Sequence, residues 1–288
     1  MRRLVLITGS GEITKKGDRV SIRTNGKAAN IPLRYIEAVI AMGTVGISGS
    51  AVNLLTSSGV PVFFLTRYGK PKGFIGPFPA RSSRRLAQYR AFEQKRSIVA
   101  KKIVMMKLDK IEKTYDFDFT DLKRNLQRSS DLDSMRGIEG TASRLMFEEF
   151  SKRIKSKKLS FKGRAYHPPP DPVNALLSLS YSLAYCMALP VVISLGFDPY
   201  IAFLHSGRGT HMAFCSDVIE PVRPLITKFV EEAITLGRFS KKHFEKDGKG
   251  YFLKKEGAVR FMEMFEINKD RIILGIKESL ISLAEVIS

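Results

Sequence analysis

The chain is short of cysteine, histidine and acidic residues. Its 288 residues include two Cys, four His and 28 Asp plus Glu, against 48 Lys plus Arg. Cys186 and Cys215 lie in apolar segments without a C-x-x-C spacing, which argues against a disulfide framework or a cysteine zinc site. We expect both to be reduced core residues of a cytoplasmic protein.

Several common functional motifs are also missing. The sequence contains no phosphate-binding P-loop and no evident Ser–His–Asp arrangement, and no hydrophobic signal region follows Met1. Residues 8–11, TGSG, resemble the start of a dinucleotide-binding fingerprint. That fingerprint requires a helix next, whereas residues 12–18, EITKKGD, are typical of a turn before another strand, so we expect a hairpin.

The excess of basic residues gives a formal net charge of +20. A lysine-rich, heat-adapted surface is the alternative explanation, but that adaptation enriches glutamate as well and predicts balance. Residues 81–128 carry 14 basic and six acidic residues, and residues 152–164 carry seven basic residues and no acidic one. Such clusters predict binding to a nucleic-acid backbone. The candidate phosphate contacts are Arg81, Arg84, Arg85, Lys152, Arg153, Lys157 and Lys158.

Residues 172–197 form an uncharged stretch that is long enough to cross a bilayer. It contains an asparagine, four serines and Pro190, and we expect a helix buried in a helical domain rather than a membrane span.

Periodicity divides the chain into a β-rich part and a helical part, which predicts an α+β fold. A small N-terminal β domain, 1–78, precedes a larger all-α catalytic domain, 79–288, with a boundary at the prolines around residue 78. The expected strands are 4–7, 19–23, 31–33, 38–42, 60–66 and 73–75, with one helix at 50–57. The expected later helices are 83–108, 119–128, 135–156, 174–194, 211–236 and 258–287.

Three residues form the candidate site. Glu139, His205 and Glu220 each lie in a segment whose other residues look built to hold it, and Asp217 precedes Glu220 by three positions. Two carboxylates that share a helix face repel each other unless a cation lies between them, although pairing with Arg223 or Arg208 is an equal alternative. Carboxylates with one imidazole suit Mn²⁺ or Mg²⁺, and a basic protein points to a phosphodiester substrate.

Four segments together resemble a known family. They are 136–144, RGIEGTASR; 171–185, DPVNALLSLSYSLAY; 196–205, GFDPYIAFLH; and 217–224, DVIEPVRP. The chain resembles the CRISPR adaptation (spacer-acquisition) endonuclease/integrase family, the larger of the two universal Cas adaptation proteins. The resemblance implies that Glu139, His205 and Glu220 bind the catalytic Mn²⁺ or Mg²⁺ and that Asp217 is a supporting acid.

The resemblance also implies an activity and partners. The enzyme would insert short duplex spacers into the CRISPR array by 3′-hydroxyl attack on a phosphodiester, and would nick or resolve branched DNA. It would be a homodimer paired through its β domains, with a small ferredoxin-like partner bridging two dimers. Many relatives have Asp where this chain has Glu220, and the turn after His205 is shorter here. A non-enzymatic DNA-coating protein and an RNase of another lineage are the alternatives.

Overall fold

The chain folds into two compact units. The first comprises Met1–Phe78, Ala165–Ser182 and Phe239–Ile267, and the second comprises Pro79–Arg164, Leu183–Arg238 and Asn268–Ser288. The computed structural model describes residues 3–24, 26–68, 70–76, 82–154, 159–165, 168–207, 209, 211–248 and 250–288. The chain passes between units after residue 78, where the sequence predicts a boundary, and the first unit also takes in two later segments assigned above to the helical domain.

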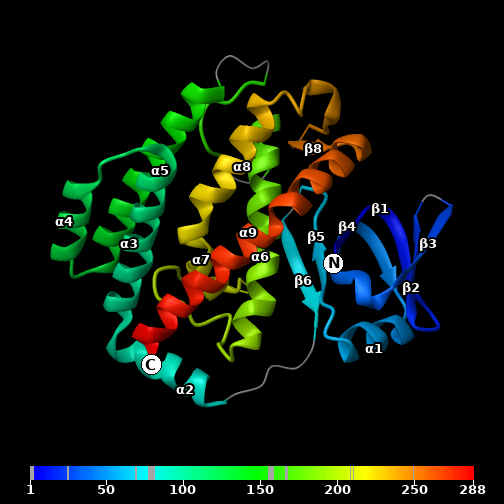
Figure 1. The fold of residues 1–288 in the computed structure, drawn as a ribbon, viewed down its shortest axis with the longest axis horizontal. Coiled ribbons are helices and arrows are strands. Elements are labelled where there is room, and N and C mark those ends of the chain that lie inside the picture. Colours follow the sequence, from blue (N-terminus) through cyan, green and yellow to red (C-terminus); the bar gives the residue numbers. More distant parts are fainter. Residues whose placement is uncertain are drawn as a thin grey trace. The chain divides into compact units, whose positions relative to one another are not determined.

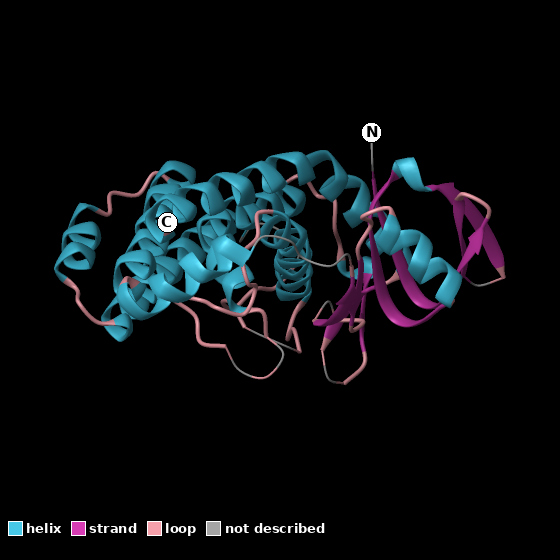
Figure 2. Ribbon diagram, turned by 90° about the horizontal axis from the view of Figure 1, so that it is seen from below, coloured by secondary structure: helices cyan, strands magenta, loops and turns pink. Residues whose placement is uncertain are grey.

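A six-stranded mixed sheet forms the first unit (Figure 2). The strand order is β3-β2-β1-β4-β5-β6, in which β1 pairs in parallel with β4, β4 pairs in parallel with β5, and the other pairs are antiparallel. The strands are β1 (Arg3–Lys16), β2 (Arg19–Thr24), β3 (Lys27–Pro32), β4 (Ile36–Ile47), β5 (Val62–Leu65) and β6 (Pro71–Ile75).

The predicted hairpin after the TGSG segment is confirmed. Gly17 adopts a left-handed φ of 63°, and Lys16 pairs with Arg19 across the turn. TGSG itself lies inside β1, which runs past the predicted end of the first strand. The reason is a close approach of two backbones: Gly9 pairs with Gly43 of β4, and a Cβ on Gly43 would lie 2.4 Å from the Gly9 carbonyl oxygen. Glycine here continues a strand that its usual loop preference would end.

Helix α1 (Gly49–Ser57) completes the core of this unit. The Ser48 hydroxyl accepts a hydrogen bond from the Ala51 N–H at 3.3 Å, which caps the helix. Ala51 and Leu55 are buried with alternate residues of the sheet. The buried strand residues are Ile7, Ile13, Val20, Ile22, Ile36, Val39 and Val62. The N-terminal β domain predicted from the alternation is therefore confirmed.

The second unit is helical. Helices α3, α5 and α8 pack against one another, and α4 packs against α3 and α5 (Figure 1). The helices that lie wholly or partly in this unit are α2 (Ser82–Gln94), α3 (Arg96–Tyr115), α4 (Thr120–Arg128), α5 (Leu132–Ile154), α6 (Pro172–Ser194), α7 (Ala213–Ile219), α8 (Arg223–Thr235) and α9 (Lys255–Ile287).

Two predicted helices are each divided in the structure. The expected helix 83–108 is broken at Lys95, whose φ of −126° and ψ of 14° leave the helical region between α2 and α3. The expected helix 211–236 is α7 and α8 joined by a 3₁₀ turn, Glu220–Val222. Pro221 lacks an N–H and its ring would crowd the carbonyl of residue 217, so regular α-helix stops there. The break places Glu220 at a helix junction.

The uncharged stretch forms α6, as predicted. By length and composition this helix could cross a membrane, but 83% of its most apolar window is buried inside the protein. The buried Ser180 hydroxyl of this helix donates to the Leu176 carbonyl at 2.8 Å. The burial agrees with the expected core helix.

A short hairpin interrupts the C-terminal part that was expected to be all helical. β7 (Phe244–Lys246) pairs with β8 (Tyr251–Leu253) in an antiparallel two-stranded sheet, within the first unit. Each strand has only three residues, too few for alternation to reveal it in the sequence.

Candidate active site

The three predicted site residues come from three different elements of the second unit. Glu139 lies on α5, His205 lies in the loop between α6 and α7, and Glu220 begins the 3₁₀ turn after α7. The His205 Nε2 lies 3.5 Å from Glu220 Oε1. The two glutamates are joined by Lys107 of α3, whose ammonium donates to Glu139 Oε1 and, at 2.7 Å, to Glu220 Oε2. The structure thus joins the two glutamates through one buried cation and places His205 beside Glu220.

Glu139 and Lys107 both occupy the apolar stripe of their helix. On α5 the buried residues Met135, Ala142 and Met146 lie on the same face as Glu139. On α3, Lys107 follows Ile103 by four residues and precedes Ile111 by four, and both isoleucines are fully buried. Because α3 packs on α5, the two charged side chains meet between the helices.

The sequence analysis missed Lys107. It was counted only among the basic residues of 81–128, but its side chain is only 3% exposed. The signal that could have identified it is its register with Ile103 and Ile111, since a lysine in an apolar stripe needs a buried partner.

Glu220 is ionised because cations surround it. Its side chain is 5% exposed, and burial alone would raise its pKa. Arg223, whose Nε lies 2.6 Å from Glu220 Oε1, together with Lys107 and His205, instead lowers the Glu220 pKa to about 2. Pairing with Arg223 was the alternative to metal binding, and the structure contains that pair; Arg208 lies outside the described residues.

Lys107 stays protonated for the reciprocal reason. Burial would lower the pKa of its ammonium group, but attraction to the carboxylates of Glu220 and Glu139 outweighs burial and raises it. The Glu139 carboxylate also accepts a hydrogen bond from the Ser143 hydroxyl at 2.8 Å, one turn further along α5.

Asp217 holds the His205 loop. Its fully buried carboxylate accepts the backbone N–H groups of residues 203, 204 and 205 at 2.6, 3.1 and 3.0 Å. It also lies 2.7 Å from His205 Nδ1, so a proton on Nδ1 leaves Nε2 directed at Glu220. Burial would lower the His205 pKa, but the bond to Asp217 and the charges of Asp217 and Glu220 raise it.

Two arginines hold the same loop through its carbonyl groups. Arg136 donates from Nε and Nη2 to the Leu204 carbonyl at 3.0 and 2.7 Å, and Arg96 donates from Nε to the Phe203 carbonyl at 3.2 Å. The segment around Glu139 therefore also anchors, through Arg136, the loop that carries His205.

The donor set fits a hard divalent ion. Two carboxylates converge on a cation, and an imidazole with one nitrogen fixed faces one of them. Among the described residues, no group of three or more His, Cys, Asp or Glu side chains is already arranged to hold a metal ion. The glutamate oxygens are paired with Lys107 and Arg223 instead, so the expected Mn²⁺ or Mg²⁺ stays a prediction.

The candidate DNA contacts differ in their exposure and in whether other side chains of the protein already engage them. Lys152 is exposed and lies 3.4 Å from Glu149, whereas Arg153 bonds Glu149 at 3.0 Å and stacks on Tyr115 at 5.1 Å. Arg84 lies over the Phe197 ring at 5.3 Å, and Arg85 is half-buried. Arg81, Lys157 and Lys158 lie outside the described residues.

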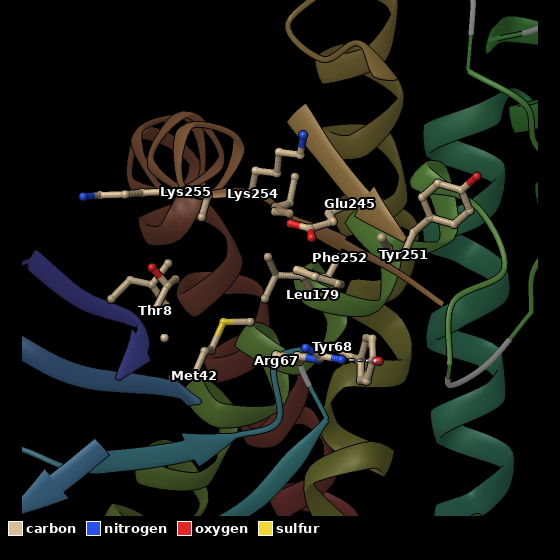
Figure 3. Close-up of a pocket in the computed structure, with 15 residues that line it drawn as sticks. Thr8, Met42, Arg67, Tyr68, Leu179, Glu245, Tyr251, Phe252, Lys254 and Lys255 are labelled. Atoms are coloured by element: carbon tan, nitrogen blue, oxygen red, sulfur yellow. Dashed lines mark hydrogen bonds between the residues drawn. The ribbon is translucent and has the colours of Figure 1, made fainter. Parts of the chain in front are cut away.

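A cavity in the first unit is lined by none of the predicted site residues or candidate DNA contacts described above. It has a volume of about 520 Å³ and lies among β1, β4, α6, the β7–β8 hairpin and the start of α9 (Figure 3). Met42 and Leu179 contribute apolar surface, and the ammonium ends of Lys254 and Lys255 point away from them. Glu245 is its one acidic lining residue, so we assign the chemistry to the second unit.

Comparison with known proteins identifies the family. The family model described as CRISPR associated protein Cas1 matches residues 5–267. CRISPR-associated endonuclease Cas1 1 of Thermodesulfovibrio yellowstonii is 30% identical over 279 residues, covering 88% of this chain and 87% of the relative. The protein of the same name from Thermus thermophilus is 29% identical, covering 91% and 84%.

Solved structures share the fold. A CAS1 protein from Thermotoga maritima superposes with a TM-score of 0.90 at 21% identity, covering 99% of this chain and 96% of that one. A casposase bound to integration product superposes with a TM-score of 0.87 at 24% identity, covering 98% and 91%. The family match spans both units and all the site residues described above, and the chain belongs to the CRISPR associated protein Cas1 family.

Proposed function

We propose that the chain is a metal-dependent DNA endonuclease and integrase of CRISPR adaptation. It joins the 3′-hydroxyl ends of short duplex spacers to a strand of the CRISPR array. The observation that carries the proposal is the convergence of Glu139 and Glu220 on a buried cation, with His205 beside Glu220. The curated relatives named CRISPR-associated endonuclease, and a fold shared with a casposase bound to integration product, support it.

Each residue has a defined task in this chemistry. Glu139, Glu220 and the Nε2 of His205 would hold Mn²⁺ or Mg²⁺, and Asp217 orients the imidazole without contacting substrate. A bound divalent ion supplies polarisation of the scissile phosphodiester and orientation of the attacking hydroxyl. Direct attack by a 3′-hydroxyl requires no covalent enzyme intermediate. Water in its place gives nicking, and the reverse reaction resolves branched DNA.

Basic residues would hold the DNA. The net charge of +20 supports binding to the phosphate backbone, with counterion release making that binding sensitive to salt. Among the described candidates, exposed Lys152 is better placed for a phosphate than Arg153, which is engaged by Glu149 and Tyr115. A solved relative in complex with DNA, TtCas1, superposes with a TM-score of 0.64.

The proposed assembly has two kinds of interface. We propose a homodimer paired through the N-terminal sheet, and a small ferredoxin-like partner that bridges two dimers. A chain of a Cas6-RT-Cas1–Cas2 complex superposes with a TM-score of 0.81 at 19% identity, which supports a partner of the Cas2 kind. A cytoplasmic location stays a prediction.

Strand transfer by site variants tests the function. We expect Glu139→Ala, His205→Ala and Glu220→Ala each to lower Mn²⁺-dependent joining of a labelled duplex by more than about a hundredfold, because each removes a metal ligand. Salt-sensitive binding of the duplex should persist. Glu148→Ala is the matched control on α5, since in the part of the chain that the structure describes Glu148 pairs only with Arg144, at the surface.

The same assay distinguishes the alternatives. A DNA-coating protein would bind the duplex without any joined or cut product in Mn²⁺ or EDTA. An RNase would cut labelled RNA and leave DNA intact. Full joining activity in all three alanine variants would contradict the assignment of the site.

A further inference from the structure

Lys107 is a buried cation between two carboxylates that come from different elements. Its side chain is 3% exposed, and its ammonium contacts Glu139 of α5 and Glu220 of the 3₁₀ turn. A buried charge is tolerated only when it is paired, and here one ammonium pairs with two carboxylates at once. The ammonium therefore does what a divalent ion bound by the same two carboxylates would do, which is to compensate their negative charge.

The surrounding charges show what this position does. Lys107 and Arg223 contribute two positive charges, and Glu139, Asp217 and Glu220 contribute three negative charges. Counted without His205, these five groups have one excess negative charge. Without the lysine they would have two, which a divalent ion would balance. Lys107 thus reduces the attraction of the site for a metal while it keeps the metal-free carboxylates from repelling each other.

We propose that Lys107 is an internal counter-ion that positions Glu139 and Glu220 in the metal-free enzyme and competes with the divalent ion for them. The inference rests on the proposed function, in which these two glutamates bind Mn²⁺ or Mg²⁺. Lys107 is a positioning residue, because it acts on substrate only through the glutamates. It keeps the site folded without metal and limits how tightly metal binds.

A second lysine of the same unit provides a matched control. Lys123 of α4 also bridges two carboxylates, Asp109 at 2.6 Å and Glu112 at 2.5 Å, both on α3. It is 27% exposed, and within the described residues it pairs with these two carboxylates and with none of the site residues. Lys123→Met removes the same charge from the same kind of bridge, away from the proposed metal.

The experiment is thermal unfolding of the full-length protein in EDTA and in increasing MnCl₂. We expect Lys107→Met to lower the melting temperature in EDTA by about 5 °C or more, because the buried Glu220 carboxylate and the partly buried Glu139 carboxylate lose their cation. Mn²⁺ should restore the stability, with half-saturation at about a tenfold lower concentration than in the wild type. Lys123→Met should lower the melting temperature by the same amount in EDTA as in MnCl₂. Lys107→Arg, which keeps the charge, should keep wild-type half-saturation within about threefold.

Each outcome decides between the proposals. An equal loss of stability for Lys107→Met with and without Mn²⁺, in a wild type that Mn²⁺ does stabilise, overturns the role of Lys107 and leaves the metal site standing. If Mn²⁺ stabilises neither protein, the metal site fails and the inference fails with it. Should Lys107→Met not fold in EDTA, recovery of folded protein on refolding with Mn²⁺ supports the proposal, and failure to recover contradicts it.

Discussion

At the scale of single residues, the site depends on the hydrogen bonds of the buried Asp217 carboxylate. Both oxygens of Asp217 are committed: Oδ2 accepts the N–H groups of residues 203 and 204, and Oδ1 accepts that of residue 205 and faces the imidazole. A group with so many internal bonds has little capacity left for a metal. Asp217 therefore supports the site through His205, which agrees with the role that the resemblance implies.

Replacing this carboxylate tests its positioning role. We expect Asp217→Asn to lower the free energy of unfolding by about 1–3 kcal/mol, because the amide nitrogen cannot accept the hydrogen bonds of one oxygen. Strand transfer should fall as His205 loses its orientation. Asp131→Asn is the control. Asp131 is exposed and its carboxylate accepts a hydrogen bond from the Ser134 N–H at 2.8 Å, so this substitution should lower the free energy of unfolding by less than Asp217→Asn does. Equal stability losses from chemical denaturation would contradict the role.

The lowered pKa of Glu220 predicts a loss of stability in acid. Its ordinary pKa of 4.5 falls to about 2 in the folded protein. A lowered folded pKa means that its contribution to stability is complete above about pH 4.5 and is lost as the pH falls through about 2. Glu220→Gln should remove this part of the dependence. Urea denaturation of both proteins between pH 2 and 7 measures it, and parallel curves would contradict the prediction.

The candidate site shows what single-residue patterns can and cannot reveal. Glu139, His205 and Glu220 were found because each lies in a distinctive segment that resembles the family. In the structure, Lys107 joins the two glutamates and His205 lies beside Glu220. Lys107 was hidden because a lysine among many basic residues gives no signal by composition, and its partners are far away in sequence. The task of Arg136, to hold the Leu204 carbonyl, depends on a loop conformation that the sequence pattern does not encode.

At the scale of elements, α5 presents Glu139 between two glycines. A Cβ added to Gly137 or Gly140 would meet nothing within 4 Å apart from the helix itself, so neither is required by packing. At Gly257, by contrast, a Cβ would lie 2.6 Å from the His243 carbonyl oxygen, where α9 begins against the β7–β8 hairpin. The same substitution should therefore have opposite effects in the two helices.

Glycine substitutions test this element-level difference. We expect Gly140→Ala to raise the free energy of unfolding by about 0.5–1 kcal/mol, because alanine restricts the unfolded chain without a clash. Gly257→Ala should destabilise the protein by about 1–3 kcal/mol, since backbone atoms must shift. Thermal unfolding compares the two variants with the wild type. A stabilising Gly257→Ala would show that the start of α9 packs differently.

Most elements could be predicted, and the exceptions have physical causes. Short β-branched or aromatic runs located the six strands, helical spacing of apolar residues located α1, and an uncharged stretch located α6. The division of the expected helix 211–236 could have been predicted from Pro221, because proline beyond the first turn of a helix interrupts it. The break at Lys95 has no comparable residue signal, and the β7–β8 hairpin is too short for one. The extent of β1 depends on its pairing with β4, which is a tertiary property.

At the scale of the whole molecule, charge and fold point to the same kind of substrate. A net charge of +20 favours polyanions in general, whereas the gathered carboxylates and imidazole favour one reaction on them. We expect exposed basic residues such as Lys152 to contribute to DNA binding, whereas Lys107 is buried between Glu139 and Glu220.

The most direct test of the central claim is the stoichiometry of Mn²⁺ binding, measured by electron paramagnetic resonance of free Mn²⁺ during titration. We predict one tightly bound ion per wild-type chain, the same for Glu148→Ala, and none for Glu139→Ala, His205→Ala or Glu220→Ala. One bound ion retained in all three of these variants would contradict the account.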